Sequence, residues 1–471
     1  MPLLRPVPLT PAAETGGVHF IAIGGAGMSG IAAAYHALGV EVSGSDRDDS
    51  PTLRHLADLG IRTFVGHDAA QLGDAQTVVV SSAIRPTNPE LAEANRRGLR
   101  VWHRSAALGA LMLGRRGVAV TGTHGKTSTS GMVATMLTAL GADPGYVIGS
   151  PLAATGESSA LGTGDAFVVE ADESDGSFLQ YPAEIVVVTN IEADHLDNWG
   201  TPERYAAGFV EMAGAEGVAT VILNADDPHT PALTAELTSR GKAVVTVGEA
   251  ADAGVRLTEV ELTPTLTRAR LIADGDDGIL DLAVPGRHNL HNAAAAYAVG
   301  RALGHEGAAL RAALGTFAGT HRRFEYKGSS AGVRVFDDYA HHPTEVAAAL
   351  AAARARVEPG GRLVAVFQPH LFSRTRDFAA DFADALGAAD LVVVCGIYPA
   401  REDAEDFPGV TADLVADRIA ANTATLLVPE LSDAATALAG LVRRGDLVLT
   451  LGAGDITTLG PLLLARLGES T

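Results

Sequence analysis

The feature that most constrains the fold is a glycine-rich turn between an apolar strand, residues 118–120, and a helix that we expect to reach about Leu140. In such a turn, backbone amides and the N-terminus of the helix together bind phosphate oxygens. Lys126 would neutralise the β- and γ-phosphates, and the Thr127 hydroxyl would bind Mg²⁺. The turn therefore predicts an ATP or GTP site. It consists of Gly122, Thr123, His124, Gly125, Lys126, Thr127 and Ser128.

The spacing of this turn differs from the general phosphate-loop pattern. That pattern places a glycine five residues before Gly125, where this chain has Val120. A glycine turn whose lysine faces solvent is the alternative interpretation. The strand–turn–helix context favours nucleotide binding.

A second glycine-rich turn follows the first apolar strand, residues 18–23, and Asp46 ends the next strand, where a ribose-binding acid is expected. The dinucleotide pattern only requires a diphosphate at a helix N-terminus, and both NAD and a UDP-sugar carry one. A tight turn without a ligand is a further alternative. Because the next domain already has an ATP loop, we favour a UDP-linked substrate over NAD. The residues of this turn are Gly24, Gly25, Gly27, Met28, Ser29 and Gly30.

Strands and helices alternate along almost the whole chain, which indicates an α/β protein with mostly parallel sheets. A length of 471 residues suggests about three domains. We expect a Rossmann-like N-terminal domain at 1–112, a central P-loop-type mononucleotide-binding domain at 113–320 and a Rossmann-like C-terminal domain at 321–471. Arg115 and Arg116 suggest a polar linker between the first two. Residues 256–285, rich in threonine, suggest a small antiparallel insert.

The charge balance limits the possible partners. Arginines and lysines number 35 against 56 acids, for a net charge of −21. This balance argues against nucleic acid and anionic membranes, while anionic small substrates would need local basic groups. The one cysteine, Cys395, follows apolar residues and is expected to be buried in a strand; it fits a reducing compartment. With no signal peptide and no apolar run of about 20 residues, we expect a cytoplasmic protein.

Further motifs lie in order along the chain, and together they resemble the Mur ligase family of ATP-dependent peptidoglycan ligases. The shortened loop Gly-Thr-His-Gly-Lys-Thr is similar to that family's phosphate loop. The strings His-His-Pro-Thr-Glu and Phe-Gln-Pro-His look most like the first ligase of the pathway; a sister ligase that recycles murein tripeptide is the alternative. The other motifs occupy residues 170–174, 189–197, 286–293, 321–324, 337–345 and 367–370, the last followed by Arg374 and Arg376.

The resemblance implies a two-step reaction with three small-molecule substrates. ATP phosphorylates the lactyl carboxylate of UDP-N-acetylmuramate, and the amine of L-alanine attacks the acyl phosphate to give an amide and phosphate. Such a reaction needs positioning and charge neutralisation rather than a protein nucleophile. Two rival classes remain: an NAD-dependent oxidoreductase, and a nucleotide-regulated binding protein without catalysis.

The same resemblance suggests roles for individual side chains. Glu170 ends an apolar strand at the carboxyl edge of a parallel sheet, and we assign it to Mg²⁺ with Thr127 and His195. The catalytic residues would be Lys126, His195, His342 and Arg374. Beyond the phosphate loop, ATP would be held by Asn289, Asn292, Arg322, Arg323 and Asp338. Helix capping is an alternative for the asparagines, and a solvated surface is one for the arginine pair.

Alanine and the acyl phosphate would be held by His341, His342, Arg374 and Arg376. For the UDP site, positions at strand ends add Ser45, Asp46, His67, Ser81 and Ser82 to the glycine turn. Several sister ligases hold a second Mg²⁺ with a carbamylated lysine in the helix after Asp-His-Leu-Asp. In this chain Phe209 takes that place, and residues 190–223 contain no lysine. We therefore expect no carbamate.

Overall fold

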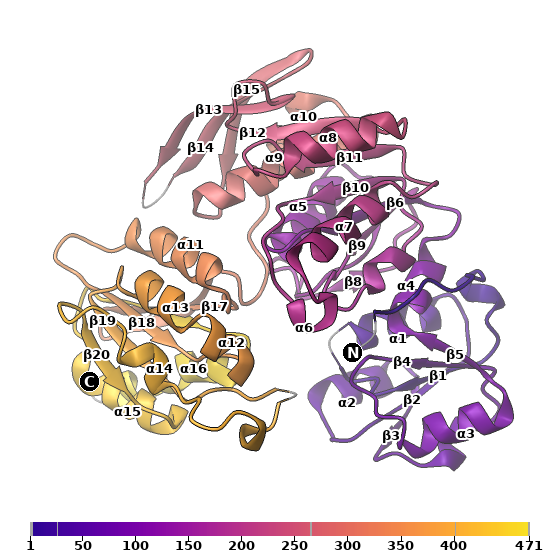
Figure 1. The fold of residues 1–471 in the computed structure, drawn as a ribbon, viewed down its shortest axis with the longest axis horizontal. Helices are drawn as coiled ribbons and strands as arrows, with labels where there is room; N and C mark the ends of the chain where they lie inside the picture. Colours follow the sequence, from indigo (N-terminus) through magenta and orange to yellow (C-terminus); the bar gives the residue numbers. More distant parts are fainter. Residues whose placement is uncertain (1–2, 26, 264–265, 401, 470–471) are drawn as a thin grey trace. The chain divides into compact units, whose positions relative to one another are not determined.

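The computed structural model describes residues 3–25, 27–263, 266–400 and 402–469. These residues contain three sheets, of five, ten and six strands (Figure 1). They form two compact units: the first holds the chain up to Thr258 with Arg270–Leu280 and His291–Phe317, and the second holds the remainder, including the chain from Ala318 onward. No helix of the described ranges is long and apolar enough to cross a bilayer.

The five-stranded sheet is parallel and has the order β3-β2-β1-β4-β5, as expected for a Rossmann-like domain. Because β1 pairs with β2 on one side and with β4 on the other, the strand order reverses at β1, where such sheets bind ligands. The strands are β1 Val18–Ile21, β2 Val42–Asp46, β3 Arg62–Val65, β4 Thr77–Val80 and β5 Arg100–His103. The helices are α1 Met28–Ala37, α2 Pro51–Asp58, α3 Pro89–Arg97 and α4 Arg104–Met112.

The ten-stranded sheet has β6, Arg116–Thr121, between β10, Ile185–Val188, and β9, Ala166–Glu170, all three parallel. These strands are almost wholly buried, which explains their continuous apolar runs. Other strands of this sheet are β7 Gly145–Val147, β8 Ser159–Ala160, β11 Thr220–Asn224 and β12 Ala243–Gly248. Its helices are α5 Lys126–Ala139, α6 Leu196–Trp199, α7 Pro202–Ala213, α8 Thr230–Ser239, α9 Arg287–Ala302 and α10 Gly307–Leu314.

Three strands occupy the region in which we expected a small insert: β13 Val255–Leu262, β14 Thr267–Ala273 and β15 Asp276–Leu282. The chain reverses between β14 and β15 at Asp274 and Gly275. Since β13 pairs in parallel with β12, these strands extend the ten-stranded sheet rather than forming a separate one.

The expected polar linker at Arg115 and Arg116 is wrong. Arg115 donates to the carbonyls of Leu161 and Gly162, both at 2.7 Å. Arg116 is the first residue of β6 and pairs with Glu184 at 2.6 Å. Both arginines have fixed partners, so the passage from α4 into β6 is structured.

The six-stranded sheet of the second unit has the order β16-β17-β21-β18-β19-β20, with β16 antiparallel to β17 and the others parallel. The strands are β16 Glu325–Ser330, β17 Val333–Asp338, β18 Leu363–Phe367, β19 Leu391–Val394, β20 Ala424–Leu427 and β21 Leu447–Leu451. The helices are α11 Pro343–Arg354, α12 Phe372–Asp377, α13 Ala379–Leu386, α14 Asp413–Ala416, α15 Leu431–Leu441 and α16 Leu459–Glu469. Cys395 directly follows β19 and is buried, as expected, and burial raises the pKa of its thiol to about 12.

Candidate active site

The phosphate loop lies between the end of β6 and the start of α5. Gly125 immediately precedes the helix with a φ of 83°, a left-handed conformation that favours glycine. A Cβ at Gly125 would lie 2.7 Å from Oδ1 of Asn292. Both the left-handed backbone and the close approach of Asn292 therefore favour glycine at this position. Asn292 belongs to α9, which thus contacts the loop.

The side chain of Lys126 turns back over its own loop. Its Nζ donates to the carbonyl of Gly122 at 2.6 Å and to that of Thr123 at 3.0 Å, and it lies 2.9 Å from Oε2 of Glu173. Burial alone would lower the pKa of the ammonium, but the neighbouring carboxylates, Glu173 foremost, raise it. Lys126 therefore keeps its positive charge beside the glycine loop.

Thr127 and Glu170 meet at the carboxyl end of the parallel strands. The Thr127 hydroxyl donates to Oε1 of Glu170 at 2.9 Å, and the backbone amide of Gly149 donates to Oε2 at 2.7 Å. A carboxylate and a hydroxyl offer the hard oxygen ligands that Mg²⁺ prefers. Thr127 and Glu170, two of the three residues expected to bind the metal, therefore fit the ion.

His195 has a left-handed backbone, φ 54°, immediately before α6. Its Nε2 lies 3.8 Å from Oε1 of Glu173 and 3.6 Å from Oδ2 of Asp194. Glu173 therefore stands between His195 and Lys126, and our reading of the sequence missed it. The motif at residues 170–174 contains it three positions after Glu170, but nothing in the motif distinguishes which acid faces the lysine.

The two asparagines of α9 differ in their surroundings. The helix begins two residues before Asn289, whose Nδ2 donates to the carbonyl of Pro285 at 2.7 Å, an interaction with the backbone that precedes the helix. Asn292 instead lines a small cavity with Thr189, Asn224 and His291. Asn289 thus donates to a carbonyl, whereas a capping side chain accepts from a backbone amide, so this bond is not a helix cap. A nucleotide contact of either asparagine stays a prediction.

The glycine turn of the first sheet is closed by Asp46, whose Oδ2 accepts from the backbone amide of Gly24 at 3.0 Å. Gly27 has a φ of 78° and precedes α1, whose first turn contains Met28, Ser29 and Gly30. Ala26, in the middle of the turn, lies outside the described residues. The turn and the ribose-binding candidate thus meet at the ends of β1 and β2, as the dinucleotide pattern predicts.

A buried network that we did not predict lies beside this turn. Its centre is Glu90, the second residue of α3, whose side chain is inaccessible to solvent. Ser45 donates to Oε2 of Glu90 at 2.7 Å, Nδ1 of His67 lies 2.9 Å from the same oxygen, and Nε2 of His19 lies 3.1 Å from Oε1. Burial raises the pKa of the carboxyl, but the three partners outweigh burial and lower it. Ser45 and His67, both expected at the UDP site, are therefore held by one ionised carboxylate.

Ser82 connects the two sheets of the first unit. Its hydroxyl donates to Oδ2 of Asp175 at 2.7 Å and lies 3.1 Å from Nε2 of His103. Burial lowers the pKa of His103 to about 4. Ser81 directly follows β4, and its carbonyl accepts from the amide of Ile84 at 3.1 Å. Of the serine pair, only Ser82 has a side-chain interaction within the described residues.

In the second unit, Arg322 and Arg323 both stack on Tyr339, at 4.8 and 5.3 Å from its ring centre. Arg322 also donates to the carbonyl of Gly452 at 2.7 Å. Asp338, at the end of β17, accepts from the amides of Phe324 and Ala340, each at 2.8 Å, and burial raises its pKa to about 6. The arginines thus have ordered partners, against the alternative of a solvated surface.

The residues expected to hold alanine are only partly together. The ring of His341 lies 5.8 Å from that of His370, which stacks on Tyr398 at 5.8 Å. His342, directly before α11, is 2% exposed and its ring lies 5.0 Å from that of Phe378.

The two arginines of α12 have different surroundings. Arg374 is buried, whereas Arg376 is exposed and pairs with its neighbour Asp377 at 2.7 Å. Arg374 is therefore the better of the two candidates.

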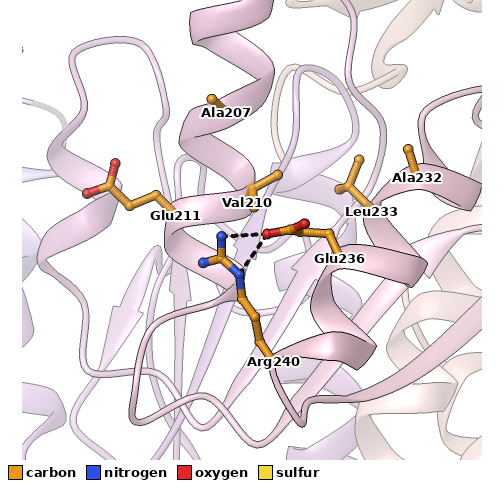
Figure 2. A pocket seen from close by; sticks show the side chains of 7 residues that line it. All are labelled: Ala207, Val210, Glu211, Ala232, Leu233, Glu236 and Arg240. Atoms are coloured by element: carbon orange, nitrogen blue, oxygen red, sulfur yellow. Dashed lines mark hydrogen bonds and ion pairs between the residues drawn. The ribbon is translucent and has the colours of Figure 1, made fainter.

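A surface depression of about 520 Å³ lies elsewhere in the first unit, between α7 and α8 (Figure 2). Its single cation, Arg240, pairs with Glu236 at 2.7 Å. None of the residues expected to act on nucleotide or substrate lines it. The depression is formed by Ala207, Val210, Glu211, Ala232, Leu233, Glu236 and Arg240.

Comparison with known families matches three consecutive sequence profiles. They are the Mur ligase family catalytic domain over residues 17–116, the Mur ligase middle domain over 120–300 and the Mur ligase glutamate ligase domain over 322–454. The three matches cover most of the chain in the order of its three sheets.

Individual relatives are similar over nearly their full length. A UDP-N-acetylmuramate–L-alanine ligase of Cutibacterium acnes is 61% identical, with 99% of each chain covered. One of Kineococcus radiotolerans is 53% identical, with 97% of each covered. The crystal structure of a UDP-N-acetylmuramate–alanine ligase from Thermotoga maritima superposes with a TM-score of 0.81 at 29% identity, covering 97% of this chain and 100% of that one.

Proposed function

The chain belongs to the Mur ligase family, and on this premise we propose that it joins L-alanine to UDP-N-acetylmuramate with cleavage of ATP. The bond formed is an amide between the lactyl carboxylate of the UDP-sugar and the amine of alanine, formed through an acyl phosphate. The reaction belongs to the synthesis of peptidoglycan precursors. The relatives that are similar over the whole chain carry this activity in their names.

One arrangement carries the proposal. At the carboxyl ends of β6 and β9, the ammonium of Lys126, the hydroxyl of Thr127 and the carboxylates of Glu170 and Glu173 meet around one glycine loop. A cation for a transferred phosphate and oxygen ligands for Mg²⁺ are the groups that phosphoryl transfer needs. A dehydrogenase would leave this arrangement without a role.

We assign the remaining groups by their position. Thr127, Glu170 and His195 would hold Mg²⁺, which would supply neutralisation of phosphate charge. Lys126 would hold the γ-phosphate, and Asn292 would contact the nucleotide. In the second unit, Arg374 and His341 would hold the amino acid. The glycine turn with Asp46, Ser45 and His67 would hold the UDP group.

We also propose three domains at residues 1–112, 113–320 and 321–471, and a cytoplasmic location.

The sister ligase that recycles murein tripeptide stays a second candidate within the family. The solved structure of a murein peptide ligase from Psychrobacter arcticus has the same fold as this chain, with a TM-score of 0.70 at 24% identity.

Phosphate release tests the proposal. The purified chain is incubated with ATP, Mg²⁺ and UDP-N-acetylmuramate, together with alanine, glycine, serine or the murein tripeptide. We expect release of phosphate and formation of an amide with alanine. Since one methyl group is worth about 1–3 kcal/mol in a pocket, glycine should be used roughly 10- to 200-fold less efficiently. A preference for the tripeptide would identify the recycling ligase, and no release with any acceptor would refute ligase activity.

A further inference from the structure

A UDP-linked substrate brings a diphosphate to the glycine turn, but the turn has no cation. Residues 22–30 contain neither lysine nor arginine. The chain carries a net charge of −21, so its overall field repels a diphosphate. A basic group from another part of the first unit would add charge neutralisation to the backbone amides and the helix N-terminus.

Arg104 lies beside the turn. It is the first residue of α4, directly after β5, and β4 separates β5 from β1 in the sheet. A Cβ at Gly27 would lie 3.0 Å from Nη1 of Arg104. The absence of a side chain at Gly27 thus leaves room for the guanidinium directly before α1.

Within the described residues, the guanidinium of Arg104 donates one hydrogen bond. Nη2 lies 3.4 Å from Oδ2 of Asp172, and the two side chains are 28% and 40% exposed. A partly exposed ion pair at this distance contributes little binding free energy. Most of the donors of Arg104 are therefore left for another acceptor, and a guanidinium matches phosphate oxygens in a bidentate manner.

We propose that Arg104 binds the diphosphate of the UDP-linked substrate, and that the substrate replaces Asp172 as its partner. This inference rests on the proposed function, which supplies the diphosphate. Asp172 then acts as a competitor: in the free chain its carboxylate occupies the guanidinium that the substrate uses. Its own position does not depend on Arg104 alone, because Oδ1 of Asp172 accepts from the amide of Ser174 at 3.0 Å.

The competition gives the two partners opposite effects on affinity. Removing Arg104 should weaken binding of the diphosphate, and removing the charge of Asp172 should strengthen it. A salt bridge that only joined two loops would behave differently, since loss of either partner would weaken binding. The sign of the Asp172 effect therefore separates a substrate contact from a structural one.

Calorimetry without ATP tests this, with UDP and UDP-N-acetylmuramate as the probes. The variants are Arg104→Met, Arg104→Lys and Asp172→Asn, and the matched control is Arg100→Met, which removes an exposed arginine that stacks on Trp102 in β5. We expect Arg104→Met to weaken binding of both probes about 10- to 100-fold, as loss of charge-assisted hydrogen bonds does. Arg104→Lys should weaken binding less than Arg104→Met does. Arg100→Met should change the affinity less than about twofold, and Asp172→Asn should tighten binding about two- to fivefold.

Equal affinities for Arg104→Met and Arg100→Met would overturn the assignment, as would weaker binding by Asp172→Asn. Melting temperatures of all variants show whether the fold is kept. If Arg104→Met does not fold, the affinities of Arg104→Lys and of Asp172→Asn for the two probes test the assignment instead. If the wild-type chain binds neither probe, the proposed function fails together with this inference. If the wild type binds both and the Arg104 variants bind equally well, only the inference fails.

Discussion

The ammonium of Lys126 lies 2.9 Å from a carboxylate oxygen of Glu173, and the two side chains are 15% and 1% exposed. Glu173 in turn lies 3.8 Å from the imidazole of His195. Burial raises the pKa of Glu173, and the positive charge of Lys126 opposes this by stabilising the ionised carboxylate. Lys126 thus has a structural role in addition to its expected role at the phosphate.

Replacing Lys126 separates these two roles. Lys126→Met should lower amide formation about 100- to 1,000-fold, because the transferred phosphate loses its main cation. It should also lower the free energy of unfolding by about 3 kcal/mol, because Glu173 is left buried without a partner. Circular dichroism should show that the fold is kept.

The double variant Lys126→Met/Glu173→Gln should recover stability but not activity. Lys327→Met removes a lysine of the second unit that pairs with Glu325, and serves as the control. Near-normal turnover of Lys126→Met would contradict the ATP assignment.

The glycine turn of the first sheet should discriminate between cofactors. UDP-N-acetylmuramate should bind in calorimetry without ATP, and NADH and NADPH should show no measurable binding. Micromolar affinity for either reduced cofactor would favour a dehydrogenase instead.

Glu90 should act on substrate affinity through the groups that it holds. Glu90→Gln keeps the size of the side chain but has one acceptor oxygen in place of two, so Ser45 and His67 lose a shared partner. We expect KM for UDP-N-acetylmuramate to rise about tenfold, with a smaller change in KM for ATP, corresponding to the loss of about one hydrogen bond to a charged group. The control is Glu93→Gln, which removes a charge from the same helix, where Glu93 pairs with Arg96. Equal kinetics of both variants would show that the network does not reach the substrate.

His103 should make the stability of the first unit depend on pH. Its pKa is about 4 in the folded chain, below the 6.5 of an ordinary histidine, because of burial. Between these values the unfolded chain binds more protons than the folded chain, so stability rises with pH. The contribution is complete above pH 6.5 and is lost as the pH falls to 4, by about 3 kcal/mol at most.

Urea unfolding of the wild type and of His103→Asn across this range measures the effect. The variant should lose the part of the slope that comes from His103. The exposed His55, replaced in the same way, should leave the slope unchanged. A His103→Asn profile parallel to that of the wild type would count against a neutral His103.

Activity should not depend on bicarbonate. The position of the carbamylated lysine in sister ligases is taken by Phe209, which is buried and packs edge-on against Tyr205 and Phe178. The chain has three lysines; besides Lys126, Lys242 donates to the carbonyls of Ala215 and Val218, and Lys327 pairs with Glu325. Assays in bicarbonate-free and bicarbonate-rich buffer should agree, and stimulation by bicarbonate would show that one of these lysines is modified.

The sequence predicted the elements that carry strong local signals. Turn glycines after apolar runs located the ends of β1 and β6, the two strands that precede the glycine-rich turns. β3 and β16 were missed because their residues are partly exposed and lack an apolar run.

For the site, the sequence predicted residues but not their partners. Motif and strand end singled out Lys126, Thr127 and Glu170, and the structure places Thr127 and Glu170 in contact. Glu90 and Arg104 lie in no motif, and the motif that holds Glu173 does not indicate which of its acids contacts Lys126. From the sequence, a glutamate in a helix, such as Glu90, is expected to face solvent, whereas the fold buries it.

The buried cysteine makes the native chain a convenient background for spectroscopy. Cys395 is inaccessible to solvent, and with a thiol pKa of about 12 it holds almost no thiolate at neutral pH, so it should resist maleimides. A cysteine placed at an exposed position such as Ser239 in the first unit or Thr436 in the second could therefore be labelled selectively without removing the native one. A labelled pair would report distances between the two units by fluorescence transfer as substrates are added.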